Sequence, residues 1–335
     1  MQRRIILTRH SKKPDPEDPT YKGLSKSGVA LARKSAQDII QYIIKSPSKS
    51  VIFLCGALDE VRTRSTEQIY GEEIKKALSR RPNEYIVITN EDIALENPNQ
   101  RNDYLKALID KNPHKKVVVT IPMSIDEFSL RKKGWFTQDG QLTEFSKKLF
   151  EKVGNDEQQA LRYWLAHQGN VDGLKGPKPI EVAKSYAQGI KRLEAMERWY
   201  AGKRPYVTGL VGHSMELDTY LTWVATGGRI DLESYERLNQ GGGMIKETEL
   251  ATITSNPVTT SVSYRGKHRI ARTLESIAAS FAVSSFILAM LAFPGITGNI
   301  IGASKSNLIG LSFLLISLIS SLLVIHLRKK INLLV

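Results

Sequence analysis

Two stretches decide the fold, Leu7-Thr8-Arg9-His10-Ser11 near the amino terminus and Gly209-Leu210-Val211-Gly212-His213-Ser214 much later in the chain. In each, an apolar run typical of a buried strand leads into a histidine, and in the first an arginine stands before it. Ligand sites of open α/β sheets lie at the carboxyl ends of the strands, so histidines that follow two strands can meet there. The two stretches therefore predict one shared site on an α/β fold.

The rest of the chain alternates between strand-like and helix-like patterns. Between residues 24 and 44, apolar side chains recur at helical spacing after serines that can cap a helix. Short apolar or β-branched runs, typical of strands, occur at residues 4–8, 51–54, 85–89, 117–121, 206–211 and 250–254. This alternation predicts a three-layer α/β/α domain with a mostly parallel sheet, over residues 1–263.

One connection is longer than an ordinary crossover between strands. Residues 99–204 include a helix-like segment from Asp156 to His167 and three tryptophans, Trp135, Trp164 and Trp199. Such length predicts an insertion that caps the site or forms a small subdomain. We expect the tryptophans to be packing residues, because they share no common spacing.

The carboxyl-terminal part is lipophilic. Residues 277–296 and 308–326 are two apolar stretches, each close to the roughly 18 to 20 residues that cross a bilayer. Basic residues lie before them in a linker at residues 264–275 and after them in a short tail at residues 328–335. The pattern predicts a transmembrane hairpin over residues 276–327 with both flanks, and the catalytic domain, in the cytoplasm. The alternative is a pair of buried core helices.

The composition of the chain limits the classes of partner and cofactor that we expect. The chain has 335 residues and a formal net charge of +14, but its lysines and arginines are scattered, which argues against nucleic acid and favours an anionic substrate or membrane surface. A single cysteine, Cys55, excludes an intramolecular disulfide and a cysteine-based zinc cluster. Since the histidines also lack metal-ligand spacing, we expect no metal and no cofactor.

Four short motifs in order resemble the histidine phosphatase superfamily, which includes the cofactor-dependent phosphoglycerate mutases. They are Arg9-His10, Leu24-Ser-Lys-Ser-Gly28, Val61-Arg62-Thr63-Arg64-Ser65-Thr66 and Val211-Gly212-His213. The resemblance covers residues 3–263, with the insertion poorly matched. It implies a phosphoglycerate mutase-like fold and phosphoryl transfer through a phosphohistidine intermediate.

The resemblance implies a role for each matched residue. His10 would be the nucleophile, and Arg9, Arg62 and His213 would bind the phosphoryl group. The chemistry agrees, because an enzyme without a metal needs fixed cationic donors around a phosphate, and arginine offers a planar fork. Neighbouring cations also favour neutral imidazole, which leaves a ring nitrogen free to attack phosphorus. Arg64 competes with Arg62 for the second arginine position.

The carboxylic acid that protonates the leaving group is less clearly marked. Leu95-Glu96, after the third predicted strand, resembles the family pattern best, and Glu91 stands nearby. Glu216, three residues after His213, is a third candidate. All three remain open at the level of sequence.

Two departures from the family pattern affect the subfamily. Ser11 stands where a glycine commonly follows the first histidine, and Ser214-Met215-Glu216-Leu217 follows the second. The second string looks more like small phosphohistidine phosphatases than like mutases. The leading hypothesis is therefore a membrane-anchored phosphatase that hydrolyses phosphomonoesters, or phosphohistidine, on a small molecule, lipid headgroup or protein. The alternatives are an inactive domain that docks phosphorylated partners and a mutase-like phosphotransferase.

Overall fold

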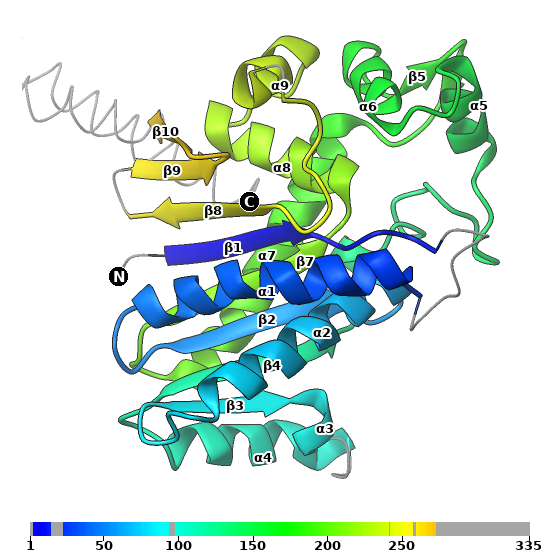
Figure 1. Ribbon diagram of the computed structural model, residues 1–335. Coiled ribbons are helices and arrows are strands. Elements are labelled where there is room, and N and C mark those ends of the chain that lie inside the picture. Colours follow the sequence, from blue (N-terminus) through cyan, green and yellow to red (C-terminus); the bar gives the residue numbers. More distant parts are fainter. Residues whose placement is uncertain (1–2, 15–22, 94–97, 241, 257–258, 273–335) are drawn as a thin grey trace, which may run out of the picture. The chain divides into compact units, whose positions relative to one another are not determined.

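The computed structural model describes residues 3–14, 23–93, 98–240, 242–256 and 259–272 (Figure 1). The chain divides into two compact units, and the first, Met1–Thr254 with Ser261–Arg269, contains every site residue discussed below. The strands of the main sheet are β1 (Arg3–Arg9), β2 (Val51–Ala57), β3 (Tyr85–Thr89), β4 (Lys116–Met123), β7 (Tyr206–Gly212), β8 (Leu250–Ser255), β9 (Thr259–Tyr264) and β10 (Lys267–Arg272). Their order is β10-β9-β8-β1-β7-β2-β4-β3.

The sheet is mostly parallel, as the sequence predicts. β1 pairs with β7, β7 with β2, β2 with β4 and β4 with β3, all in parallel. All six predicted strands are present. In the β1–β7 pair, Arg9 lies opposite Gly212. The residues that follow these two positions, His10 and His213, therefore leave the sheet side by side.

Helices cover both faces of the sheet. Helices α1 (Lys26–Lys45) and α2 (Val61–Leu78) pack on one face, against alternate strand residues such as Ile6 and Leu54. Helices α4 (Pro98–Asp110), α7 (Pro179–Ala201) and α8 (Ser214–Thr226) belong to the other face, with Ile5 and Phe53. Because successive strand side chains point to opposite faces, β1 and β2 supply both cores. The result is the predicted three-layer α/β/α arrangement.

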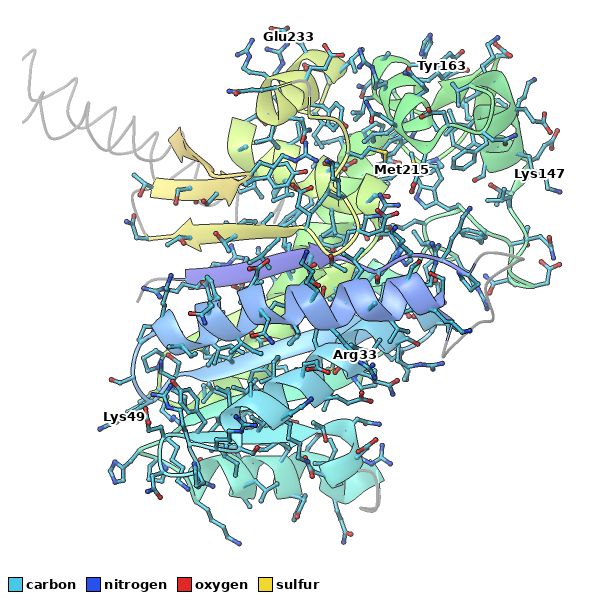
Figure 2. All side chains as sticks on the ribbon, in the orientation of Figure 1. Arg33, Lys49, Lys147, Tyr163, Met215 and Glu233 are labelled. Atoms are coloured by element: carbon cyan, nitrogen blue, oxygen red, sulfur yellow. The ribbon has the colours of Figure 1, made fainter. Side chains whose placement is uncertain are left out.

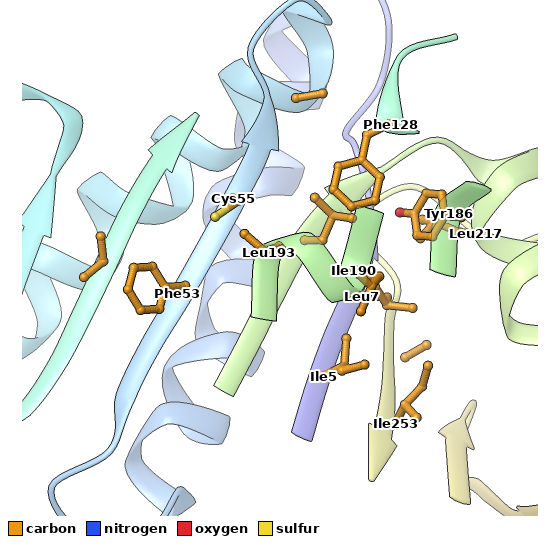
Figure 3. Close-up of a cluster of buried hydrophobic side chains, with 14 of the residues drawn as sticks. Ile5, Leu7, Phe53, Cys55, Phe128, Tyr186, Ile190, Leu193, Leu217 and Ile253 are labelled. Atoms are coloured by element: carbon orange, nitrogen blue, oxygen red, sulfur yellow. The ribbon is translucent and has the colours of Figure 1, made fainter. Parts of the chain in front are cut away.

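The core on the α7 side is shown in Figure 3, where Phe53 and Cys55 of β2 and Leu7 of β1 lie among side chains of α7 and α8. All three are fully buried. Burial of an aliphatic or aromatic side chain of this size contributes roughly 1.5 to 3 kcal/mol. The strands that end at the site are thus held by apolar packing.

The segment between β4 and α7, residues 124–178, is called the cap below. It contains a 3-10 turn (Asp126–Phe128), α5 (Glu144–Lys152), α6 (Glu157–Ala166), β5 (Asn170–Val171) and β6 (Leu174–Lys175). The insertion predicted over residues 99–204 is too wide, because α4, β4 and α7 are part of the sheet and its helical layers. The other short helices are α3 (Asn90–Ile93) and α9 (Leu232–Asn239).

The three tryptophans divide between core and surface. Trp135 and Trp164 lie in the core of the cap, where Trp164 is fully buried. Trp199, on α7, is 52% exposed, and its ring meets the Tyr200 ring edge to face at 4.8 Å between centroids. It faces solvent near the end of a long helix.

Within the described ranges, no helix has both the length and the apolar character to cross a membrane. The predicted spans at residues 277–296 and 308–326 and the tail at residues 328–335 lie outside those ranges. Part of the predicted linker at residues 264–275 is described, and its residues 267–272 form β10.

Candidate active site

The carboxyl ends of three neighbouring strands bring the predicted phosphate-handling residues to one place. The backbone N–H of His10 donates to the Gly212 carbonyl at 3.0 Å, and the His10 and His213 rings meet edge to face with centroids 4.9 Å apart. Arg62 lies in the first turn of α2, just after β2. Together with Arg9, these residues line one cavity of about 410 Å³.

The surroundings of His10 fix its protonation state and its tautomer. Nδ1 lies 2.7 Å from the Ser11 carbonyl oxygen, which only accepts hydrogen bonds. Burial, with the Arg62 and Arg9 guanidinium groups, lowers the pKa of His10 to about 3. The neutral ring therefore carries its proton on Nδ1, and Nε2 holds the free lone pair that a nucleophile needs.

This pKa gives a direct prediction for titration by NMR. Because the pKa is lowered, the neutral ring persists as the pH falls, and its proton uptake occurs only near pH 3. Following the His10 ring resonances from about pH 8 to about pH 5, we expect no titration step, whereas an unperturbed imidazole passes its midpoint near pH 6.5. A midpoint near 6.5 for His10 would show that the arginines and burial do not act on it as described.

His213 is the N-cap residue of α8 and is buried. Burial, followed by electrostatic interaction with His10 and by the positive charges of Arg62 and Lys133, lowers its pKa well below the ordinary value. Its Nε2 has no hydrogen-bond partner among the described residues and lies 3.7 Å from a Glu60 carboxylate oxygen. A neutral imidazole with an unpaired nitrogen at a helix N-terminus is suited to contact an anionic group.

Arg9 is held in position from several sides. Its Nη1 donates to the Ile245 carbonyl at 3.0 Å and its Nη2 to Glu157 at 2.7 Å. The Thr248 N–H in turn donates to the Arg9 carbonyl at 3.0 Å. Arg9 Nε is buried and has no partner among the residues described. The guanidinium is therefore pre-positioned at the cavity, with its Nε–H still unused.

The two arginines that competed in the sequence lie differently. Arg62 lines the cavity. Arg64 turns away, and its Nη1 donates to the Leu58 carbonyl at 3.0 Å in the loop before α2. Residues two apart on a helix do not share a face, so only one of the pair lines the site.

Ser11, the main departure from the family pattern, is accommodated without disturbing His10. Its hydroxyl donates to the Gly28 carbonyl at 2.6 Å, and its N–H donates to Thr66 Oγ1 at 3.0 Å. A Cβ at Gly28 would lie 2.7 Å from the Lys12 carbonyl, so this close approach of the loop to α1 requires glycine. Ser11 thus links the segment after His10 to α1 through Gly28 and to α2 through Thr66.

The three candidate acids have three different outcomes. Glu96 lies outside the described residues. Glu91 lines a different, small cavity of about 60 Å³ beside Glu67 and Thr120. Glu216 lines the same cavity as the histidines and is fully buried, and burial raises its pKa, although the Lys133 ammonium opposes the rise.

Four charged residues at the site were not anticipated from the sequence, and one of them, Glu247, lines the cavity 3.8 Å from Arg9 Nη2. Lys133, from the cap, donates to Glu216 at 2.5 Å, and the two side chains are only 5% and 1% exposed. Glu157, at the start of α6, accepts from Arg9 and from the Ser214 hydroxyl, both at 2.7 Å. Glu60 precedes α2 and approaches His213. Only Glu60 carries a local signal, because it stands two residues before Arg62 at a strand end.

The described residues show no cluster of three or more histidine, cysteine, aspartate or glutamate side chains that could hold a metal ion. The cationic groups around the cavity come instead from arginine and lysine, with Lys13 lining it beside Arg9 and Arg62. These fixed charges can neutralise a phosphoryl group directly.

Comparisons with known proteins give only distant structural likeness. No family model matches the sequence, and a search of curated proteins gives no match. The fold is similar to a solved structure called mycobacterial hydrolase 1, at 13% identity and a TM-score of 0.39, over 82% of this chain and 98% of that one. A mycobacterial glucosyl-3-phosphoglycerate phosphatase aligns at 12% identity and a TM-score of 0.38, over 76% of this chain and 92% of that one. At TM-scores this low, the likeness carries no argument about the chemistry of this chain.

Proposed function

We propose that this protein is a phosphohydrolase that cleaves phosphomonoesters through a covalent phosphohistidine on His10. The observation that carries the proposal is the fixed tautomer of His10, whose Nε2 lone pair belongs to a cavity lined by Arg9, Arg62 and His213. A neutral nucleophile among fixed cations is the arrangement that phosphoryl transfer without a metal requires.

In the first step, the His10 Nε2 lone pair forms a bond to phosphorus and the bond from phosphorus to the leaving oxygen breaks. Arg9 and Arg62 neutralise the phosphoryl oxygens, whose charge spreads in the transition state. His213 donates a hydrogen bond to the same oxygens. In the second step, a water oxygen attacks phosphorus and the water gives a proton to the carboxylate that protonated the leaving oxygen. The P–N bond breaks, and inorganic phosphate leaves with the His10 ring neutral again and the carboxylic acid restored.

The leaving oxygen takes its proton from a carboxylic acid in this scheme. Glu96 remains the prediction from sequence. Of the two other candidates from sequence, Glu91 and Glu216, only Glu216 lines the cavity, and the rise of its pKa on burial favours a bound proton. Lys133, its hydrogen-bond partner, would keep the carboxyl group oriented.

We also propose that the catalytic unit is held at a membrane with its site in the cytoplasm. The support is the pair of apolar stretches at residues 277–296 and 308–326, flanked by basic residues. Fractionation of cells that make the full chain tests this part. The protein is expected in the membrane fraction after a high-salt wash, and release by salt would contradict anchoring.

Glu157 gives a prediction about substrate affinity. Its carboxylate holds Arg9 and Ser214, two donors that a phosphoryl group would use, and its negative charge opposes an incoming phosphate dianion. A Glu157→Gln variant keeps the shape and removes the charge, so we expect KM for phosphomonoesters to fall about 3-fold to 10-fold. Glu151→Gln, on the exposed face of α5, is the matched control and should leave KM unchanged. A higher KM in Glu157→Gln would instead show that the carboxylate positions Arg9 for binding.

The proposed function is tested by assaying the full chain in detergent against a panel of phosphomonoesters without added metal and with a chelator present. Release of inorganic phosphate that survives the chelator supports the proposal. Binding of inorganic phosphate without any turnover would favour the docking-domain alternative. Transfer of phosphate to a second alcohol faster than to water would favour the phosphotransferase.

A further inference from the structure

The cavity is lined by both charged and apolar side chains. Arg9, Arg62 and Lys13 supply positive charge, and Glu157, Glu216 and Glu247 supply negative charge. The cap and the first turn of α8 supply six apolar or aromatic residues, Leu130, Trp135, Phe136, Leu142, Phe150 and Met215. We call these six the apolar wall. Met215, labelled in Figure 2, follows Ser214 in the first turn of α8, whose N-cap is His213.

Two residues of the apolar wall are presented by a small hairpin in the cap. Phe136 and Leu142 lie directly opposite each other in an antiparallel bridge. The Thr143 N–H donates to the Trp135 carbonyl at 3.2 Å, and the Thr137 N–H donates to the Gln141 carbonyl at 2.8 Å. Opposite residues of a hairpin point to the same face, so these backbone bonds direct Phe136 and Leu142 together into the cavity.

The apolar wall rests on the packed core of the cap. Trp135 meets Trp164 edge to face at 5.0 Å between ring centroids and contacts Phe145 at 6.1 Å. In front of this buried layer, Phe136, Leu142 and Phe150 are only partly buried, so their surface remains open toward the cavity. A preformed apolar surface of this kind gains free energy when an apolar group covers it.

The apolar wall offers little to a hydrophilic substrate. Among the described residues lining the cavity, Asn155 and Ser214 are the uncharged amide and hydroxyl side chains, and the Ser214 hydroxyl already donates to Glu157. Within the apolar wall, the indole Nε1–H of Trp135, buried without a partner, is the only side-chain N–H or O–H group. A sugar or glycerol group lying against the apolar wall would therefore leave most of its hydroxyls without partners, and such unpaired groups are costly.

We propose that the cavity selects phosphomonoesters whose alcohol is a hydrocarbon group, with the phosphate at Arg9 and Arg62 and the hydrocarbon against Phe136 and Leu142. This proposal rests on the proposed phosphatase function and names its substrate class. Aromatic and alkyl substrates both fit this class, because in each the alcohol esterified to the phosphate is apolar.

The test compares substrates that share a primary-alcohol leaving group, so that only the apolar contact differs. They are 2-phenylethyl phosphate, hexyl phosphate and glycerol 3-phosphate, and binding of the corresponding non-hydrolysable phosphonates is measured in parallel. For the full chain we expect kcat/KM and affinity to be at least about 10-fold higher for the two apolar compounds. A preference between phenylethyl and hexyl identifies which apolar source the cavity takes.

The variants Phe136→Ala and Leu142→Ala should each lower kcat/KM for the two apolar substrates about 10-fold more than they lower kcat/KM for glycerol 3-phosphate. Trp199→Ala, which removes an exposed aromatic side chain of α7 outside the cavity, is the control and should change neither value. Equal kcat/KM for all three substrates would overturn the substrate class and leave the phosphatase function standing. Selective phosphonate binding without turnover would overturn the phosphatase function and leave the apolar selectivity standing.

Discussion

A His10→Gln variant is expected to lose phosphomonoester hydrolysis by about 10⁴-fold or more in kcat, because it removes the only atom that forms the covalent bond to phosphorus. Glutamine keeps a polar side chain of similar reach, and its amide N–H can still donate to the Ser11 carbonyl, which now accepts from Nδ1. The site should therefore keep its shape and its affinity for inorganic phosphate. Initial rates and phosphate binding are the two measurements.

The matched control is His114→Gln, an exposed histidine in the turn between α4 and β4. It should behave as the wild type in both measurements. If His10→Gln retained a tenth or more of the rate, the histidine would be a binding group and another nucleophile, or water itself, would attack phosphorus.

An Arg62→Met variant is expected to lower kcat by about 10²-fold to 10³-fold, the range measured when one fixed donor to a developing charge is removed. Methionine keeps an unbranched aliphatic chain at this position and removes the guanidinium charge. Arg64→Met is the control within the same helix, because Arg64 donates to the Leu58 carbonyl instead of lining the cavity. Its kcat should change less than about 3-fold.

The comparison of the two variants separates a specific contact of Arg62 with the phosphoryl group from the effect of losing one positive charge near α2. Both remove one positive charge at nearly the same place in the sequence. Equal losses would show that only net charge near α2 matters, and a larger loss in Arg64→Met would reverse the assignment of the second arginine.

The sequence predicted the architecture well because the relevant signals are local. Apolar runs marked the strands, and the parallel pairing of β1 with β7 brings His10 and His213 together although the chain separates them widely. This meeting of the two histidines could be predicted because ligand sites of α/β sheets lie at the carboxyl ends of the strands. The arginine after β2 joined them because β2 is the neighbour of β7.

The features of the site that the sequence did not predict depend on contacts made by the cap. Glu157 meets Arg9, and Lys133 meets Glu216, across long stretches of chain with no local spacing that would link them. The insertion boundaries failed for a similar reason, since an apolar strand and two helices inside the predicted insertion belong to the main layers. The apolar wall was equally hidden, because the pairing of Phe136 with Leu142 depends on a hairpin.

The most direct test of the central claim is to trap the covalent intermediate. Full-length protein mixed with a phosphomonoester is quenched in alkali, where phosphohistidine survives, and digested, and the phosphorylated peptide is sequenced by mass spectrometry. The mechanism predicts phosphate on His10 in the wild type and none in His10→Gln. Rapid turnover with no phosphate on His10 at any time, or phosphate on another residue in the wild type, would contradict it.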